Sequence, residues 1–173
     1  MEYSDQKIVV GGSELVSFGK RAVDVPAKID TGADGSSVWA SNIRINKKDV
    51  LVFSLFGEGS PYYNGKIFKR KDYKVAVVRS ATGEEQVRYR THLVIRLAGK
   101  KIRVLFNLSD RSRNNFPVLI GKRTLKGRFI VDASKAAVQY PKNPRTLGLV
   151  KELKKNPYEF DQKYGKNRMS KGD

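Results

Sequence analysis

The 173-residue sequence predicts an all-β domain over residues 1–140, followed by a basic tail over residues 141–173. Three observations support this organisation. Short apolar segments alternate with turn residues from residue 8 to residue 131, as in strands joined by tight turns. Helical periodicity is almost absent, so we expect at most one short helix. Residues 141–173 hold nine Lys or Arg against four Asp or Glu and few apolar residues, so we expect this tail to be ordered only if it docks.

The individual strands are predicted from alternation and from turn residues. The clearest element is a hairpin in which Leu93–Leu97 and Ile102–Leu108 flank the turn Ala98–Lys100. A second hairpin is expected from residues 73–78 and 86–91, with its tip at Ser80–Glu85. The other expected elements are leading strands at 8–10 and 15–18 that pair with each other, strands at 36–40, 50–56, 118–121 and 128–131, one helical turn at 122–126 and a short helix at 150–155.

One of the predicted strands leads into a turn of unusual chemistry. Residues 23–29 alternate between apolar and polar side chains, which predicts a half-buried strand, and Pro26 favours an edge position. The strand is followed by Asp30-Thr31-Gly32, in which Gly32 permits backbone geometry that a side chain would forbid. We therefore expect Asp30 at a tight bend with amide groups close by. An ordinary turn is the alternative interpretation, because Asp, Thr and Gly are all common in turns.

Composition restricts the partners and the compartment. Thirty-five Lys and Arg against seventeen Asp and Glu leave a net charge of +18, which attracts nucleic acid, anionic membranes or acidic peptides; simple solubility explains it equally well. No apolar run approaches the length of a membrane span, and we expect no membrane partner. We see no basic segment followed by an apolar core at the N-terminus, so no secretory signal is expected. The absence of cysteine excludes disulfides and is compatible with the cytoplasm, where we place the protein.

Taken together, these segments resemble a known family. Asp30-Thr31-Gly32-Ala33, followed by the apolar strand Val118–Gly121, resembles the pairing of retropepsin-like aspartic proteases. More narrowly, the sequence is similar to the bacterial and archaeal family known as ATP-dependent zinc proteases, which is often associated with ATP-grasp glutamate ligases. The resemblance covers residues 8–138 and implies a closed β-barrel, an aspartic-type endopeptidase activity and an ATP-grasp ligase partner. The matching blocks, in this order, are residues 27–33, 108–111, 116–121 and 125–132.

The sequence departs from this family at two places. After Asp-Thr-Gly-Ala the family usually has Arg and then Thr, whereas this chain has Asp34 and Gly35. After the apolar strand the family usually has Arg, whereas this chain has Lys122 before Arg123. Asp34 is similar to the Asp of viral retropepsins that meets the basic residue after this strand. We therefore expect Asp34 to pair with Lys122 or Arg123.

The resemblance implies a catalytic turn of Asp30, Thr31 and Gly32. One carboxylate cannot perform this reaction alone, since one must be ionised while the other donates a proton. The chain has a single Asp-Thr-Gly, so the second Asp30 must come from a second copy in a two-fold homodimer, braced by Thr31. Residues 57–65 compete with the tip at Ser80–Glu85 for the role of a flap over the substrate. The expected substrate-binding residues are Ala33, Asp34, Ser80, Ala81, Thr82, Gly83 and Ile120.

Metal and nucleotide cofactors are not expected. The chain has one histidine, His92, and no cysteine, which is too few of the usual ligands for a catalytic zinc site. It has no Walker motif for ATP either. Two functions remain: an endopeptidase, whose positive charge suits acidic or glutamate-extended peptides, and a non-catalytic basic module that binds nucleic acid or the ribosome. The features that favour the second are the basic tail and Lys66, Lys69, Arg70, Lys71, Lys74, Arg88 and Arg90, with Tyr62, Tyr63 and Tyr73 for stacking.

Overall fold

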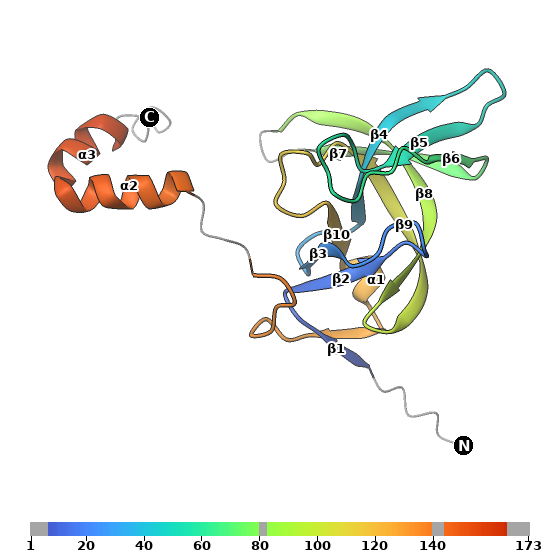
Figure 1. The fold of residues 1–173 in the computed structure, drawn as a ribbon, viewed down its shortest axis with the longest axis horizontal. Helices are drawn as coiled ribbons and strands as arrows, with labels where there is room; N and C mark the ends of the chain where they lie inside the picture. The colour runs from blue at the N-terminus through green and yellow to red at the C-terminus, as the bar shows by residue number, and fades with distance from the viewer. Residues whose placement is uncertain (1–6, 80–82, 140–143, 166–173) are drawn as a thin grey trace. The chain divides into compact units, whose positions relative to one another are not determined.

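The computed structural model describes residues 7–79, 83–139 and 144–165, which belong to two compact units, residues 1–138 and residues 139–173. In the described residues, the first unit contains eleven strands and one helix of a single turn (Figure 1). The expectation of a mostly β fold is therefore confirmed. The strands are β1 (Ile8–Val10), β2 (Ser13–Ser17), β3 (Val25–Asp30), β4 (Ser36–Ile45), β5 (Leu51–Leu55), β6 (Ile67–Arg70), β7 (Tyr73–Arg79), β8 (Glu85–Leu97), β9 (Lys100–Ser109), β10 (Val118–Gly121) and β11 (Phe129–Val131), and the helix is α1 (Lys122–Leu125).

Six strands of the first unit form a closed ring. Neighbours in the order β10, β3, β2, β8, β9 and β4 are hydrogen-bonded, and β4 pairs again with β10. The interior is filled by apolar side chains, of which Phe53, Phe56 and Phe106 are the largest with no exposed surface. The apolar residues of the alternating pattern therefore face this core, and the polar residues between them face solvent.

The β8–β9 hairpin confirms the clearest prediction from the sequence. Its turn consists of Ala98 and Gly99, which both have positive φ, of 47° and 78°. Two successive residues in this region are typical of the tight turns that match the twist of a hairpin. The predicted strands at 86–91 and 93–97 are one continuous strand, β8, in which the buried Thr91 donates a hydrogen bond to the carbonyl of Asp72.

The expected pairing of the two leading strands is wrong. β1 pairs in parallel with β11, whereas β2 pairs with β3 and β8. Gly11 and Gly12 do not turn the chain back; they pass against the carbonyl of Lys135, which accepts a hydrogen bond from the Gly12 amide at 2.7 Å. A Cβ at Gly11 would overlap that carbonyl, so the glycine is needed for close approach.

From the sequence, one strand was placed wrongly and another was left out. β3 is not an edge strand, because it lies between β2 and β10. β10 pairs with β3 only from Ala27 onward, so Pro26 has a neighbour on one side alone and costs no hydrogen bond to β10. β6 was not predicted, since its four residues are too short to show a pattern; it pairs with β5 and buries only Phe68.

The second unit contains the helices α2 (Pro144–Lys155) and α3 (Pro157–Tyr164), so the expectation of at most one short helix is wrong. The side chain of Asn156 accepts a hydrogen bond from the amide of Glu159 and caps α3, and Pro157 follows it at the first helical position. Lys163 of α3 binds Glu152 of α2 with an N–O distance of 2.7 Å. No helix in the described part of the chain has both the length and the apolar character needed to span a bilayer.

Candidate active site

The turn that follows β3 is placed by strand pairing. β10 runs parallel to β3, with Gly121 opposite Asp30. The amide of Lys122 donates to the carbonyl of Ala33 at 2.7 Å, and the amide of Arg123 donates to the carbonyl of Asp34 at 3.1 Å. Residues 30–34 are therefore fixed against the start of α1, about ninety residues away in the sequence.

Two small residues behind the turn make this close approach feasible. A Cβ at Gly121 would overlap the backbone carbonyls of Gly35 and Ala33, so a side chain does not fit there. The buried hydroxyl of Ser36 accepts a hydrogen bond from the Gly121 amide at 3.1 Å and lies 2.8 Å from the hydroxyl of Thr124. These contacts join the start of β4, the end of β10 and α1 into one support for the Asp30 turn.

The carboxyl group of Asp30 is held by the turn that it begins. Its Oδ1 accepts hydrogen bonds from the amides of Gly32 at 3.0 Å and Ala33 at 3.1 Å. Gly32 does not have positive φ, so the reason expected from the sequence is wrong. A Cβ on Gly32 would lie only 3.3 Å from Asp30 Oδ1, so the glycine is suited to this turn by space.

The other carboxyl oxygen of Asp30 faces a cation that the sequence did not single out. Lys28 Nζ lies 3.1 Å from Asp30 Oδ2, and the Asp30 side chain is 24% exposed. Partial burial raises the pKa of Asp30, but the hydrogen bonds from Lys28 and the Gly32 amide, together with the charge of Lys28, outweigh it and hold that pKa below its ordinary value. Asp30 in a single chain is therefore an ionised carboxylate.

The expected ion pair at Asp34 is present. Lys122 Nζ lies 2.9 Å from Asp34 Oδ1, and both side chains are exposed. The hydrogen bond and charge of Lys122, with a smaller contribution from the charge of Arg123, lower the pKa of Asp34. Because exposed pairs are screened by water and salt, this contact contributes little to stability.

The other predicted site residues differ in how far they are exposed to solvent. Thr31 is exposed, and its hydroxyl makes no hydrogen bond within the described residues. Ile120 is fully buried in the core, so it offers no surface to a ligand in a single chain, contrary to its expected role in binding. Gly83 has a positive φ of 85°. Ser80, Ala81 and Thr82 lie outside the described residues.

A basic pocket of about 530 Å³ lies beside the Asp30 turn. Ala33, Asp34 and Gly35 form one wall, and Ala76, Val77 and Val78 of β7 belong to another. The competing flap loop, residues 57–65, instead contributes Gly57 and Glu58 to a different pocket, next to Trp39. Five arginines line the basic pocket: Arg79, Arg88, Arg90, Arg111 and Arg123.

Arg111 lies near the candidate carboxylate. It is partly buried, and its Nε donates to the carbonyl of Phe116 at 3.0 Å. Burial and the charge of Arg88 lower the pKa of Arg111, whereas the negative charge of Asp30 raises it. Sequence reasoning missed Arg111 and Lys28 as site residues, although both occur in blocks that carry the family resemblance.

Comparison with known proteins identifies a family for this chain. Residues 9–142 match the model of the RimB-like family, described as retropepsin-like aspartic endopeptidase RimB. A protein of Shewanella pealeana named probable alpha-L-glutamate ligase is 32% identical over 138 residues, which cover 77% of this chain and 30% of that protein. A Shewanella halifaxensis protein of the same name has the same identity and coverage.

The fold has a solved counterpart. A Legionella pneumophila protein of unknown function is similar with a TM-score of 0.59 and 25% identity, over 75% of this chain and 95% of that one. Because the family model covers most of the sequence, this chain belongs to the RimB-like family of retropepsin-like aspartic endopeptidases. The chain spans only about 30% of the length of the curated relatives that it matches.

Proposed function

We propose that this protein is an aspartic endopeptidase whose catalytic pair is formed by Asp30 from each of two copies in a homodimer. The observation that carries the proposal is the Asp30 turn itself. Two backbone amides fix one carboxyl oxygen, while the carboxyl group remains partly exposed at the end of a strand. A second copy related by a two-fold axis would bring an identical carboxyl group to the first.

The electrostatics of a single copy explain why two are needed. Alone, Asp30 is ionised, because Lys28 and the Gly32 amide favour the charged form. Two carboxylates about 3 Å apart cannot both ionise, so the pair shares one proton. The ionised member draws a proton from water, and the protonated member donates to the carbonyl of the scissile bond. The pair would titrate as a unit with two separated pKa values.

Neighbouring residues have supporting roles in this proposal. The exposed hydroxyl of Thr31 braces one turn against the other across the dimer axis. The ion pair of Asp34 with Lys122 holds the far end of the turn against α1. The β7–β8 hairpin serves as the flap, since Ala76 and Val78 line the same pocket as Ala33 and Asp34.

We propose acidic peptides, including glutamate-extended ones, as substrates. Guanidinium groups bind carboxylates in a planar, bidentate geometry, and five arginines line the pocket beside Asp30. Among the described residues of its lining, Asp34 is the only acidic one and is paired with Lys122, while Arg79 is paired with Glu85. The pocket therefore presents an excess of positive charge to a peptide bound next to the carboxyl pair.

A glutamate ligase is the partner that the comparisons favour. The matching segment forms about 30% of relatives named probable alpha-L-glutamate ligase. An enzyme that adds glutamate and one that removes it would act on the same acidic chain. The absence of cysteine suits a shared cytoplasmic location.

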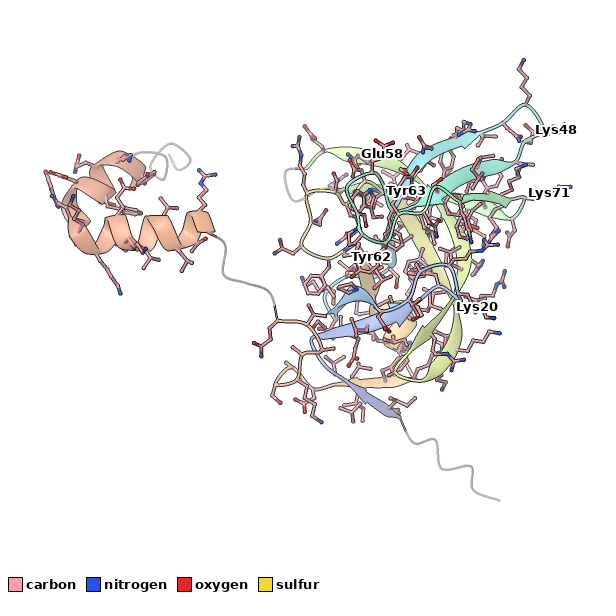
Figure 2. The ribbon with its side chains drawn as sticks, in the orientation of Figure 1. Lys20, Lys48, Glu58, Tyr62, Tyr63 and Lys71 are labelled. Carbon is pink, nitrogen blue, oxygen red and sulfur yellow. The ribbon has the colours of Figure 1, made fainter. Side chains whose placement is uncertain are left out.

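The alternative, a non-catalytic basic module, loses part of its expected support. Tyr62 and Tyr63 are partly buried and pack against the core, and the ring of Tyr62 contacts Phe56 (Figure 2). Tyr73 packs edge-on against Tyr89. These rings are therefore not free platforms for stacking on bases.

Cleavage of matched peptides tests the substrate proposal. We expect kcat/KM for a peptide ending in several glutamates to exceed that for the same peptide ending in glutamines, by about tenfold at low salt and less at about 0.5 M salt. Arg88→Gln should reduce this preference, whereas Arg96→Gln, on the same strand but outside the pocket, should not. Equal cleavage of both peptides would refute the acidic substrate but not the protease. Cleavage of neither by a folded dimer would favour the basic module.

A further inference from the structure

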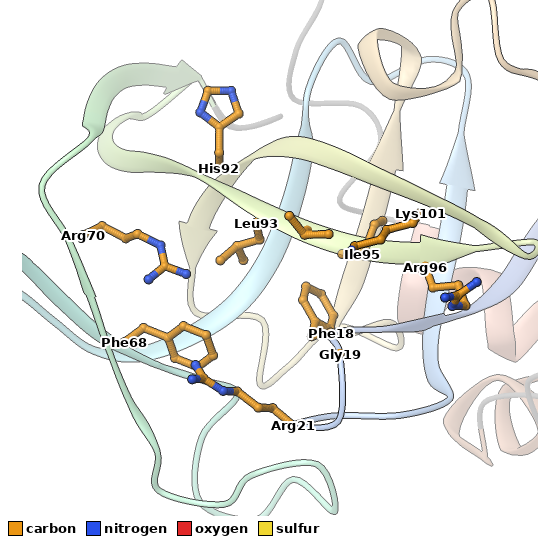
Figure 3. A pocket seen from close by; sticks show the side chains of 11 residues that line it. Phe18, Gly19, Arg21, Phe68, Arg70, His92, Leu93, Ile95, Arg96 and Lys101 are labelled. Carbon is orange, nitrogen blue, oxygen red and sulfur yellow. The ribbon is translucent and has the colours of Figure 1, made fainter.

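A second basic pocket lies on a different part of the first unit. It has a volume of about 560 Å³ and shares no lining residue with the pocket beside Asp30. Phe18, Leu93 and Ile95 contribute to its lining although each is almost wholly buried, and none of the eleven lining residues is acidic (Figure 3). The cationic residues in the lining are Arg21, Arg70, Arg96 and Lys101.

Arg21 is the outermost member of a stack. The rings of Phe53 and Phe68 are stacked, with centroids 5.3 Å apart and planes 16° apart. Arg21 Cζ lies 4.7 Å from the centroid of Phe68, and Figure 3 shows its guanidinium group against that ring. Arg21 is an exposed residue, so a ligand can reach its side chain. A planar ring could continue the stack there.

The loop that carries Arg21 is held in place. The Arg21 carbonyl accepts a hydrogen bond from Asn64 Nδ2 at 2.8 Å, and the Arg21 amide donates to the carbonyl of Phe18 at 3.3 Å. The Phe18 amide in turn donates to the carbonyl of Ala22 at 2.7 Å. The backbone is therefore arranged before any ligand binds, which lowers the entropic cost of binding.

Arg70 supplies a second charge next to the same ring. Its Cζ lies 5.5 Å from the centroid of Phe68, and burial together with the positive charge of Arg21 lowers its pKa. In the described residues, neither Arg21 nor Arg70 forms an ion pair with a carboxylate. Two adjacent cations without an acidic partner favour an anionic ligand.

We propose that this pocket binds a nucleotide, with the base stacked on Arg21 and the phosphate at Arg70. An acidic peptide would satisfy the charges but has no ring in its acidic side chains to continue the stack. A phosphate alone has no ring to stack on Arg21. The nucleotide is either free or part of a single strand. Lys20 and Lys71 are exposed, adjoin Arg21 and Arg70 in the sequence, and suit the backbone of a strand (Figure 2). The site does not depend on the proposed protease activity.

Arg21→Lys is the informative variant, because it keeps the charge but removes the planar group. With a fluorescein-labelled single-stranded RNA 10-mer, we expect fluorescence anisotropy to show binding about tenfold weaker for Arg21→Lys than for wild type. Arg44→Lys, an exposed arginine outside the pocket, should bind as wild type does. Peptide cleavage should be unchanged in both variants.

Competition distinguishes the two sources of the nucleotide. If AMP displaces the RNA and inorganic phosphate does not, a free nucleotide fits the site; if neither displaces it while Arg21→Lys still weakens binding, the ligand is a strand. Both results support the proposal. Equal binding by wild type and Arg21→Lys, an equal loss in Arg44→Lys, or displacement by inorganic phosphate as efficient as by AMP would overturn it.

Independently of any variant, the methyl resonances of Leu93 and Ile95 should shift on adding RNA, and unchanged resonances would refute the site.

Discussion

Asp30→Asn is expected to abolish peptide hydrolysis, with kcat/KM reduced at least about a thousandfold. Asn has nearly the same shape, and its side-chain oxygen can still accept the hydrogen bonds that the Gly32 and Ala33 amides give to Asp30 Oδ1. The fold should therefore survive. The amide cannot ionise, however, so the pair can no longer take a proton from water. Initial rates on a glutamate-extended peptide, with thermal unfolding measured in parallel, provide the test.

The chain offers a matched control for this substitution. Asp132 follows strand β11, and its Oδ1 accepts hydrogen bonds from the amide and hydroxyl of Ser134 at 3.0 and 2.6 Å. Asp132→Asn therefore changes the same chemical group in a similar turn, and it should retain wild-type activity. Residual activity above about a tenth of wild type in Asp30→Asn, or an equal loss in Asp132→Asn, would count against catalysis by Asp30.

Lys28→Gln is expected to change the pH dependence of the reaction. In wild type, the hydrogen bond and charge of Lys28 lower the pKa of Asp30, which keeps one carboxylate ionised at lower pH. Without that cation the pKa of Asp30 rises, so activity on the acidic side of the profile should be lost at higher pH than in wild type. A profile of kcat/KM against pH measures this directly.

The same linkage applies to stability. A carboxyl group whose pKa is lowered on folding stabilises the fold above its unfolded pKa, and this contribution disappears as the pH falls through the folded pKa. Lys28→Gln should therefore narrow the difference in stability between neutral and acidic pH. Lys100→Gln removes the same charge from the exposed β8–β9 turn and should leave both profiles unchanged. If the acidic side of the profile of kcat/KM against pH is the same for Lys28→Gln as for wild type, Lys28 does not act on the catalytic pair.

Local sequence patterns predicted the parts of the fold that depend on neighbouring residues. The alternation through Leu93 and Ile102 predicted the β8–β9 hairpin because its two strands are adjacent and its turn needs only two residues. The partners of β1 and β3 could not be found in this way. β1 pairs with β11 about 120 positions away in sequence, and β3 pairs with β10 about 90 positions away, so nothing local specifies either pairing.

The candidate site was predictable to a similar extent. Asp30 was identified from its own turn. The ion pair between Asp34 and Lys122 was expected from the resemblance to retropepsins. Lys28 was predicted only to lie on the polar face of the strand; Asp30, two residues later, lies on the same face, and the two side chains meet there. The five arginines of the basic pocket occur at scattered positions from 79 to 123, and they meet because β7, β8, α1 and the loop after β9 converge there.

In the second unit, the first half of α2 and the whole of α3 were missed for a different reason. A short helix was expected only at 150–155, because basic composition dominated the interpretation of residues 141–173. The combination of Asn156, Pro157 and Glu159 is a local signal for a capped helix, and the structure confirms that Asn156 caps α3. Composition alone therefore underestimated the order that capping provides.

Subunit mixing tests the central claim, that the catalytic pair is shared between two copies. Wild-type protein is refolded together with a ninefold excess of Asp30→Asn, so that nearly every wild-type chain has an inactive partner. If each active site needs Asp30 from both copies, activity per wild-type chain should fall about tenfold. The same excess of Asp132→Asn should cause no loss. Unchanged activity per wild-type chain in the presence of excess Asp30→Asn would contradict a shared pair and would mean that a single chain is catalytic.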